Sequence, residues 1–270
     1  MMEDKSHILY NNLLYSCVDQ KQRGNEQFIA EHALGYIISG ETQLFTNEGT
    51  KIFKAGSIGL IRRNQLIKSI KVPPPNGGEF RSVNIFLDQG FLRNYSAENK
   101  LEPVGKYTGN YIRILADDPF IKGYFDSLMP YFDPAAILPN APLADLKTKE
   151  AVELLLRLDP NLKDFLFDFS EPYKIDLEAY MNKHYMFNVP TAQFAQLTGR
   201  SLASFKRDFE KIFQTSPGQW LQQKRLSEAH YLISQKGRKP SEVYLDVGFE
   251  NLSHFSYSFK KAYGVAPSMI

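Results

Sequence analysis

The stretch from Ser201 to Phe213 constrains the fold most, because it has the pattern of an amphipathic helix with two different faces. Apolar side chains recur along it at intervals of three and four, which places them on one face and predicts their burial. These residues are Leu202, Phe205, Phe209 and Ile212. A second set, one residue later, lies on a different face of the helix and includes three charged residues: Ala203, Lys206, Arg207 and Glu210.

A helix-turn-helix arrangement follows from the neighbouring residues. Thr191 to Thr198 is predicted to form a short helix, and Gly199 supplies the tight turn before the charged helix. A similar pair is predicted further on, with a helix over 240–246, a turn at Gly248-Phe249 and a helix over 251–263. Pro217 to Gln235 is predicted to form one long helix between the pairs. In the last helix the expected apolar set is Leu252, Phe255, Phe259 and Ala262.

The charge of the chain is unevenly distributed. The formal net charge is +2, but residues 172–270 hold 13 Lys and Arg against 8 Asp and Glu, so the remainder is slightly acidic. A moderately basic C-terminal third suits a module that meets polyanions. The single cysteine, Cys17, excludes an intramolecular disulfide. We expect a cytoplasmic protein without a membrane partner, because neither a signal peptide nor a membrane-spanning apolar run is present.

Residues 8–87 consist of short apolar runs rich in Ile, Val, Tyr and Phe, separated by turn residues such as Ser39-Gly40-Glu41 and Asn47-Glu48-Gly49. This pattern predicts an antiparallel β-barrel or sandwich. The fragment GETQLFTNEGTKIFKAGSIGLIRRNQ resembles the cupin-like barrel of many bacterial regulators. The histidines of the N-terminal region, His7 and His32, do not form the cluster of an enzymatic cupin, so we expect no metal, no cofactor and no enzyme.

The barrel interior is either packed or holds one small ligand, and the sequence does not distinguish these. Arg62 and Arg63 are candidate contacts to an anionic effector. Because adjacent residues on a strand point to opposite faces, we expect at least one of them to be solvated.

Residues 106–171 have a helical pattern. Helices are predicted over 120–132, 143–158 and 161–169, the second with an apolar face of Leu143, Leu146, Ala151, Leu154, Leu155 and Leu158. Such helices pack either on the barrel or on a second copy of the chain, which would make a homodimer through residues 120–169. A domain boundary is predicted near Ser170-Glu171-Pro172.

The C-terminal region resembles the double helix-turn-helix domain of the AraC/XylS family of bacterial transcription regulators. The runs RSLASFKRDFEKIFQTSPGQWLQQKRLSEA and VGFENLSHFSYSFKKAYGVAPS carry the resemblance. It implies an α+β chain with a cupin-like antiparallel barrel over 1–105, a helical linker or dimerisation segment over 106–171, and an all-α DNA-binding domain over 172–270. The LLLRLDP and YMNKHY segments are similar to the branch that activates type III secretion genes, in which the front domain contacts proteins.

The resemblance implies a sequence-specific regulator of double-stranded DNA. Its DNA-contacting positions carry over to Ala203, Ser204, Lys206, Arg207, Ser253, His254, Tyr257, Lys260 and Lys261. Lys and Arg favour guanine, Ala203 can meet a thymine methyl, and Lys260 and Lys261 are nearer the phosphates. We expect an activator, and hence contact with RNA polymerase, controlled at the barrel by a small molecule or a regulatory protein.

The second unit departs from the family pattern. Tyr244 stands where alanine is usual, and Tyr257 where arginine is frequent. We therefore expect the first unit to carry more of the sequence specificity. The alternatives are a non-catalytic interaction protein with degenerate helix-turn-helix units and, further off, a cupin-type enzyme.

Overall fold

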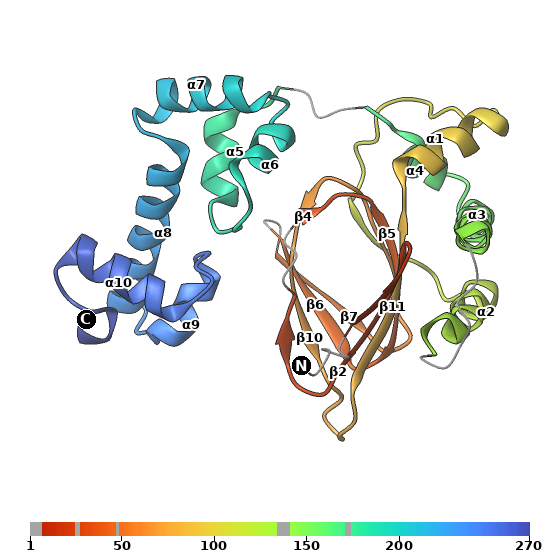
Figure 1. The fold of residues 1–270 in the computed structure, drawn as a ribbon, viewed down its shortest axis with the longest axis horizontal. Coiled ribbons are helices and arrows are strands. Elements are labelled where there is room, and N and C mark those ends of the chain that lie inside the picture. The colour runs from red at the N-terminus through yellow and green to blue at the C-terminus, as the bar shows by residue number, and fades with distance from the viewer. Residues whose placement is uncertain (1–6, 25–27, 47–48, 134–140, 171–173) are drawn as a thin grey trace. The chain divides into compact units, whose positions relative to one another are not determined.

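The computed structural model describes residues 7–24, 28–46, 49–133, 141–170 and 174–270 of the chain. The chain divides into two compact units, residues 1–170 and 171–270 (Figure 1). Asn47-Glu48, in the predicted turn, and Glu171-Pro172, at the predicted boundary, lie outside the described residues. None of the helices in the described ranges has the length and apolar content that crossing a bilayer requires.

The N-terminal unit is built on antiparallel β-sheets. The larger sheet has the order β1 (His7–Tyr10), β2 (Leu13–Val18), β11 (Phe80–Leu87), β5 (His32–Ser39), β8 (Ile58–Ile61) and β12 (Ile112–Ile114). A second sheet has the order β3 (Gln22–Arg23), β10 (Lys68–Val72), β6 (Glu41–Thr46) and β7 (Gly49–Lys54). A short pair joins β4 (Phe28–Ile29) to β9 (Gln65–Leu66). The antiparallel barrel class predicted from the sequence is confirmed. The strands of the barrel belong to three separate hydrogen-bonded sheets and do not form one closed sheet.

The turn between β5 and β6 depends on glycine. Gly40 has a φ of +77°, and a Cβ on it would lie 2.4 Å from the carbonyl oxygen of Val72. The predicted turn at Ser39-Gly40-Glu41 is therefore present, and it requires both the left-handed backbone and the missing side chain.

Helices cover the outer face of the larger sheet (Figure 1). They are α1 (Gln89–Glu98), α2 (Pro119–Leu128), a 3₁₀ turn (Met129–Phe132), α3 (Ala141–Leu158) and α4 (Leu162–Phe167). One apolar core joins strand residues such as Leu34 and Val83 to helix residues such as Phe125, Leu155 and Phe165. Of the two predicted environments for these helices, the structure shows packing on the barrel. Helix α1 was not predicted from the sequence.

The buried side of α3 agrees with the predicted one at Ala151 and Leu155 and differs elsewhere. Its described buried residues are Ala144, Thr148, Ala151, Val152 and Leu155. Leu143 and Leu146 are exposed, the latter to 59%. The Thr148 hydroxyl accepts a hydrogen bond from Asn12 Nδ2 at 2.8 Å, so the helix approaches the barrel closely here and small side chains occupy the contact. Prediction from leucine spacing alone missed this.

The C-terminal unit is all-helical, as predicted. Its helices are α5 (Leu177–His184), α6 (Thr191–Leu197), α7 (Leu202–Phe213), α8 (Pro217–Ser234), α9 (Pro240–Asp246) and α10 (Leu252–Tyr263). Helices α6 and α7 meet at Gly199 and α9 leads into α10 through Gly248, with φ values of +65° and +102°. Figure 1 shows α8 running between the two pairs. The two predicted helix-turn-helix units and their connecting helix are confirmed: the first unit is formed by α6 and α7, and the second unit by α9 and α10.

Candidate nucleic-acid interface and barrel cavity

Helix α7 presents the first candidate DNA-reading face. Its N-cap, Ser201, accepts a hydrogen bond at Oγ from the Ser204 amide at 3.2 Å, which starts the helix. Phe205 and Phe209 are buried, as predicted. Leu202 and Ile212, also predicted to be buried, are each 42% exposed. The inward row continues to Phe213, whose ring packs 4.6 Å from that of Trp220 on α8.

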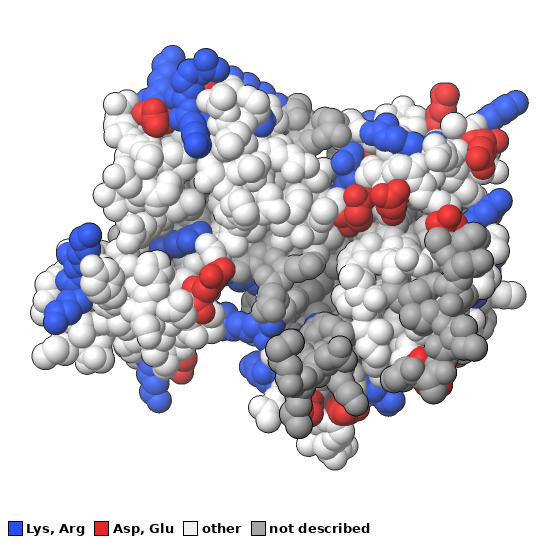
Figure 2. Space-filling model, viewed as in Figure 1, with Lys and Arg blue, Asp and Glu red and all other residues white. Residues whose placement is uncertain are grey.

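The other face of α7 is open to solvent. Ala203, Lys206 and Arg207 are exposed and Ser204 is half-buried. No hydrogen bond or ion pair engages the Lys206 ammonium or the Arg207 guanidinium within the described ranges. Figure 2 shows Lys and Arg side chains gathered over the α7 end of the unit. The predicted contact positions of the first unit therefore share one accessible, basic face.

Helix α10 presents the second face. Its N-cap, Asn251, accepts at Oδ1 from the His254 amide at 2.7 Å. The buried residues are Phe255, Ser258 and Phe259, whereas Leu252 and Ala262, predicted to be inward, are exposed. Ser258 is inward because it lies one turn from Phe255 and beside Phe259. The predicted contact residues are all exposed: Ser253, His254, Tyr257, Lys260 and Lys261.

Tyr244 occupies the site where the family pattern has alanine. Its side chain is half-buried, and its ring lies 6.5 Å from that of Phe255 on α10. The Tyr244 carbonyl accepts from the Phe249 amide at 2.8 Å, so the turn into α10 still closes. The second unit accommodates the larger residue at the edge of its core.

Two buried or partly buried arginines organise this domain, and sequence reasoning assigned neither a contact. Arg200, with its side chain 6% exposed, donates Nε to Asp208 at 3.0 Å and Nη1 to the carbonyls of Ile175 and Thr198. Its hydrogen bonds, together with those of Lys174, lower the pKa of Asp208. Arg225 on α8 bonds to the α5–α6 loop. Most of the acceptors are backbone carbonyls, which carry no signal in the sequence.

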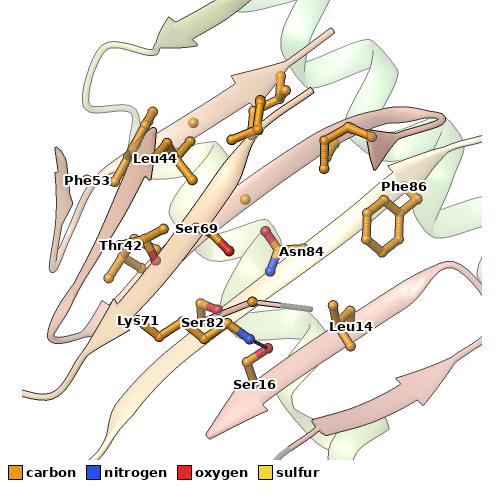
Figure 3. A pocket seen from close by; sticks show the side chains of 18 of the residues that line it. Leu14, Ser16, Thr42, Leu44, Phe53, Ser69, Lys71, Ser82, Asn84 and Phe86 are labelled. Atoms are coloured by element: carbon orange, nitrogen blue, oxygen red, sulfur yellow. Dashed lines mark hydrogen bonds between the residues drawn. The ribbon is translucent and has the colours of Figure 1, made fainter. Parts of the chain in front are cut away.

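The barrel contains a partly open cavity of about 440 Å³ (Figure 3). Apolar side chains such as Leu14, Leu44, Phe53 and Phe86 line part of it. A polar group lines the rest: Ser16, Gln22, Arg23, Thr42, Ser69, Lys71, Ser82 and Asn84. Lys71 Nζ donates to Ser16 Oγ at 3.0 Å. No Asp or Glu is among the described lining residues, so the cavity favours neutral or anionic molecules.

Glycines open space for the polar lining. A Cβ on Gly35 would lie 2.5 Å from Asn84 Oδ1, and one on Gly24 would lie 2.2 Å from Ser69 Oγ. The absence of side chains at these two positions therefore lets Asn84 and Ser69 occupy their places at the cavity wall.

Arg62 and Arg63 do not line the cavity in the described part of the barrel. Arg62 Nη2 pairs with Asp168 Oδ2 at 2.6 Å, and Arg63 Nη2 donates to the Ser170 carbonyl at 3.1 Å. Both side chains are largely buried, contrary to the expectation that one is solvated. They hold the end of the N-terminal unit.

Asp168 is the centre of this anchor. Burial would raise its pKa, but hydrogen bonds from Ser170 and from the Tyr107 amide, together with the charge of Arg62, lower it below the usual value. The described residues contain no group of three or more His, Cys, Asp and Glu side chains arranged to hold a metal ion.

A cavity-bearing antiparallel barrel, followed by two helix-turn-helix units on one connecting helix, defines a DNA-binding transcription regulator with a regulatory front domain. Residues 32–166, half of the chain, match the family described as the ExsA N-terminal regulatory domain, and residues 194–270 match a helix-turn-helix domain. The chain belongs to the AraC family, near its type III secretion activator branch. This family consists of regulators, in agreement with the expectation that the chain is not an enzyme.

Individual proteins are similar over different lengths. The HTH-type transcriptional regulator ExsA of Pseudomonas aeruginosa is 26% identical over 250 residues, covering 88% of this chain and 85% of that protein. The virulence regulon transcriptional activator VirF of Yersinia enterocolitica is 27% identical over 92 residues, 34% of each chain. Among solved structures, apo ToxT from Vibrio cholerae is 14% identical, with 96% of this chain and 97% of that chain covered and a TM-score of 0.47.

Proposed function

We propose that the chain activates transcription by inserting α7 and α10 into successive major grooves on one face of double-stranded DNA, in the bacterial cytoplasm. The observation that carries this proposal is the pair of capped helices with exposed outer faces, fixed to the two ends of α8. Helix α8 has 18 residues and spans about 27 Å at 1.5 Å per residue, which suits two helices that enter grooves about 34 Å apart. The similarity to VirF, a transcriptional activator, supports activation, and an activator would contact RNA polymerase.

Within this proposal the first unit supplies most of the base recognition. Lys206 and Arg207 are exposed donors that suit guanine O6 and N7, and Ala203 leaves room for a thymine methyl. Ser204 lies beside them at the start of the helix. The second unit offers Ser253, His254 and Tyr257 to base edges, while Lys260 and Lys261 contact phosphates.

Regulation is proposed to act through the barrel cavity. Its mixed lining, with Lys71 and Arg23 and without a described carboxylate, suits a small neutral or anionic molecule with an apolar part. A regulatory protein bound to the N-terminal unit is the second candidate, favoured by the match to the ExsA N-terminal regulatory domain. A homodimer through residues 120–169 is compatible with the exposed Leu143 and Leu146 of α3.

Selection of duplexes from a random DNA pool by the full chain tests the proposal. The selected duplex should be bound in the presence of excess unrelated DNA, and binding should weaken steeply between about 50 and 200 mM salt. Failure to enrich any sequence, with equal competition by all DNA, would favour the interaction-protein alternative.

A further inference from the structure

The guanidinium of Arg225 lies at the junction of the two helix-turn-helix units. Its Nε donates to the Tyr185 carbonyl at 2.8 Å and its Nη2 to the Phe187 carbonyl at 2.9 Å. Its Nη1 donates to Asn188 Oδ1 at 3.2 Å. All three acceptors belong to the loop between α5 and α6, at the entrance to the first unit, whereas Arg225 itself is on α8.

The same loop touches the turn of the second unit. Asn188 Nδ2 donates to Glu250 Oε1 at 2.6 Å, and Glu250 directly precedes the N-cap of α10. A Cβ on Gly248 would lie 2.6 Å from the Met186 carbonyl oxygen and 2.9 Å from Arg225 Nε. The α9–α10 turn therefore packs directly on the Arg225 group and its loop, and glycine is required at the contact.

A partly buried charge of this kind is costly unless its donors are satisfied. Burial lowers the pKa of Arg225 to about 10, partly offset by the charge of Glu250, so the side chain remains a cation at neutral pH. Without its acceptors the guanidinium would favour a position in water. The group is therefore stable only while the loop, α8 and the turn keep their present places.

We infer that Arg225 is a positioning residue for paired DNA reading: it locks the first unit to the second so that the protein accepts its two half-sites at one spacing only. This inference rests on the proposed use of both recognition helices. Helix α8 connects to each unit through short loops, 214–216 and 235–239, and each unit has its own core on one half of α8. The Arg225 group adds a direct link between the units, close to the middle of α8.

The test compares duplexes that carry the selected site with its half-sites at the original spacing or with one or two base pairs added between them. Each added pair moves the second half-site by about 3.4 Å and turns it by about 35°. The wild-type chain should lose about tenfold or more in affinity on the shifted duplexes. Arg225→Met should bind the original duplex more weakly and lose about threefold or less on shifting.

Arg200→Met is the matched control. Arg200 is also a buried arginine with several hydrogen bonds, but its partners Asp208, Ile175 and Thr198 all belong to the first unit. This variant can lose stability and affinity, yet its ratio between original and shifted duplexes should equal that of the wild type. Asn188→Ala removes the hydrogen bond to Glu250 and one of the three acceptors of Arg225, and it keeps the two backbone acceptors. It should lower the ratio even if Arg225→Met fails to fold.

Thermal unfolding by circular dichroism separates folding from spacing effects. The inference is overturned if folded Arg225→Met, or Asn188→Ala, has the same ratio of affinities for the original and the shifted duplexes as the wild type. An equal loss of the ratio in Arg200→Met overturns it as well. If the wild-type chain binds the original and the shifted duplexes equally well, this inference is wrong but the proposed DNA recognition stands. If the wild-type chain binds no selected duplex, the proposed function and this inference are both wrong.

Discussion

At the scale of single residues, Arg207 is the side chain whose loss should change sequence preference most. It is exposed on α7, and its guanidinium can donate two hydrogen bonds to one guanine. Arg207→Ala should cost about 1–3 kcal/mol on the selected duplex and relax the preference at one base pair, measured by fluorescence anisotropy on single-base variants.

Lys261→Ala is the companion variant, because Lys261 lies in the last turn of α10 and is assigned to phosphate contact. It should weaken binding evenly over all sequences and reduce the slope of log affinity against log salt by about one. If both variants lose the same affinity on every duplex, the division between base and phosphate contacts is wrong.

Lys71 should set the charge preference of the cavity. The test uses two dyes of nearly equal shape, 1-anilinonaphthalene-8-sulfonate and the neutral N-phenyl-1-naphthylamine. Lys71→Met should weaken binding of the sulfonate dye by about tenfold, because a hydrogen bond to a charged group contributes about 1.5–3 kcal/mol. Binding of the neutral dye should stay nearly unchanged. Lys54→Met, at an exposed lysine outside the lining, is the control. Equal weakening of both dyes would indicate damage to the cavity instead of a lost charge.

At the scale of elements, the end of the N-terminal unit is held by the Arg62–Asp168 ion pair. Asp168→Asn should destabilise the chain at pH 7 by about 3 kcal/mol, because it leaves a largely buried arginine without its counter-ion. Asp159→Asn removes the partner of Arg113 in an ion pair that is more exposed than Arg62–Asp168, so it should cost about 1 kcal/mol or less. Urea unfolding measures both.

The pH dependence of the Asp168 contribution has a definite sign. Because the folded-state pKa of Asp168 is lowered, its stabilising effect is present above the unfolded-state pKa of about 4 and is lost as the pH falls through the folded-state pKa. The difference between wild type and Asp168→Asn should therefore be largest near neutral pH and narrow below about pH 4. A difference independent of pH would mean that the ion pair does not stabilise this end of the unit.

The β5–β6 turn gives a second test at this scale. Gly40→Ala should destabilise by more than the strain of a positive φ, about 1–2 kcal/mol, because its Cβ would also meet the Val72 backbone. Gly56→Ala should cost only that strain, since Gly56 has a φ of +88° and no heavy atom within 4 Å of a Cβ. Equal unfolding midpoints for the two variants would contradict this account of the turn.

The outer side of α3 tests the proposed homodimer. Leu146→Glu should leave the fold intact and lower self-association in sedimentation velocity, because Leu146 is exposed. Leu155→Glu, which places a charge in the apolar core between the helices and the larger sheet, should instead unfold the N-terminal unit. Unchanged self-association in folded Leu146→Glu would remove this side of α3 from the dimer proposal.

At the scale of the whole molecule, the sequence predicted what depends on local periodicity. The helices of the C-terminal unit were predictable because Phe205 with Phe209, and Phe255 with Phe259, recur at helical spacing between turn and cap residues. The same reasoning wrongly predicted burial for Leu202, Ile212, Leu143 and Leu146. Periodicity shows which side of a helix a residue lies on, but not how much of that side the neighbouring elements cover.

Contacts between distant residues were not predictable. Asp168 lies 106 positions from Arg62, and Asn188 lies 37 from Arg225. The sequence pattern identified Arg62 and Arg63 as residues of interest, but only the fold shows which acceptors they meet. The cavity likewise depends on Gly24 and Gly35, which make room for side chains on other strands.

Protection of guanine N7 from methylation by dimethyl sulfate on the selected duplex tests the central claim most directly, because this atom lies in the major groove. Paired reading by α7 and α10 predicts two protected segments, centred about 10 base pairs apart on one face of the DNA, and Arg207→Ala should remove the protection of one guanine in the segment contacted by α7. A single protected segment that survives Arg207→Ala, or protection spread evenly along the duplex, would contradict it.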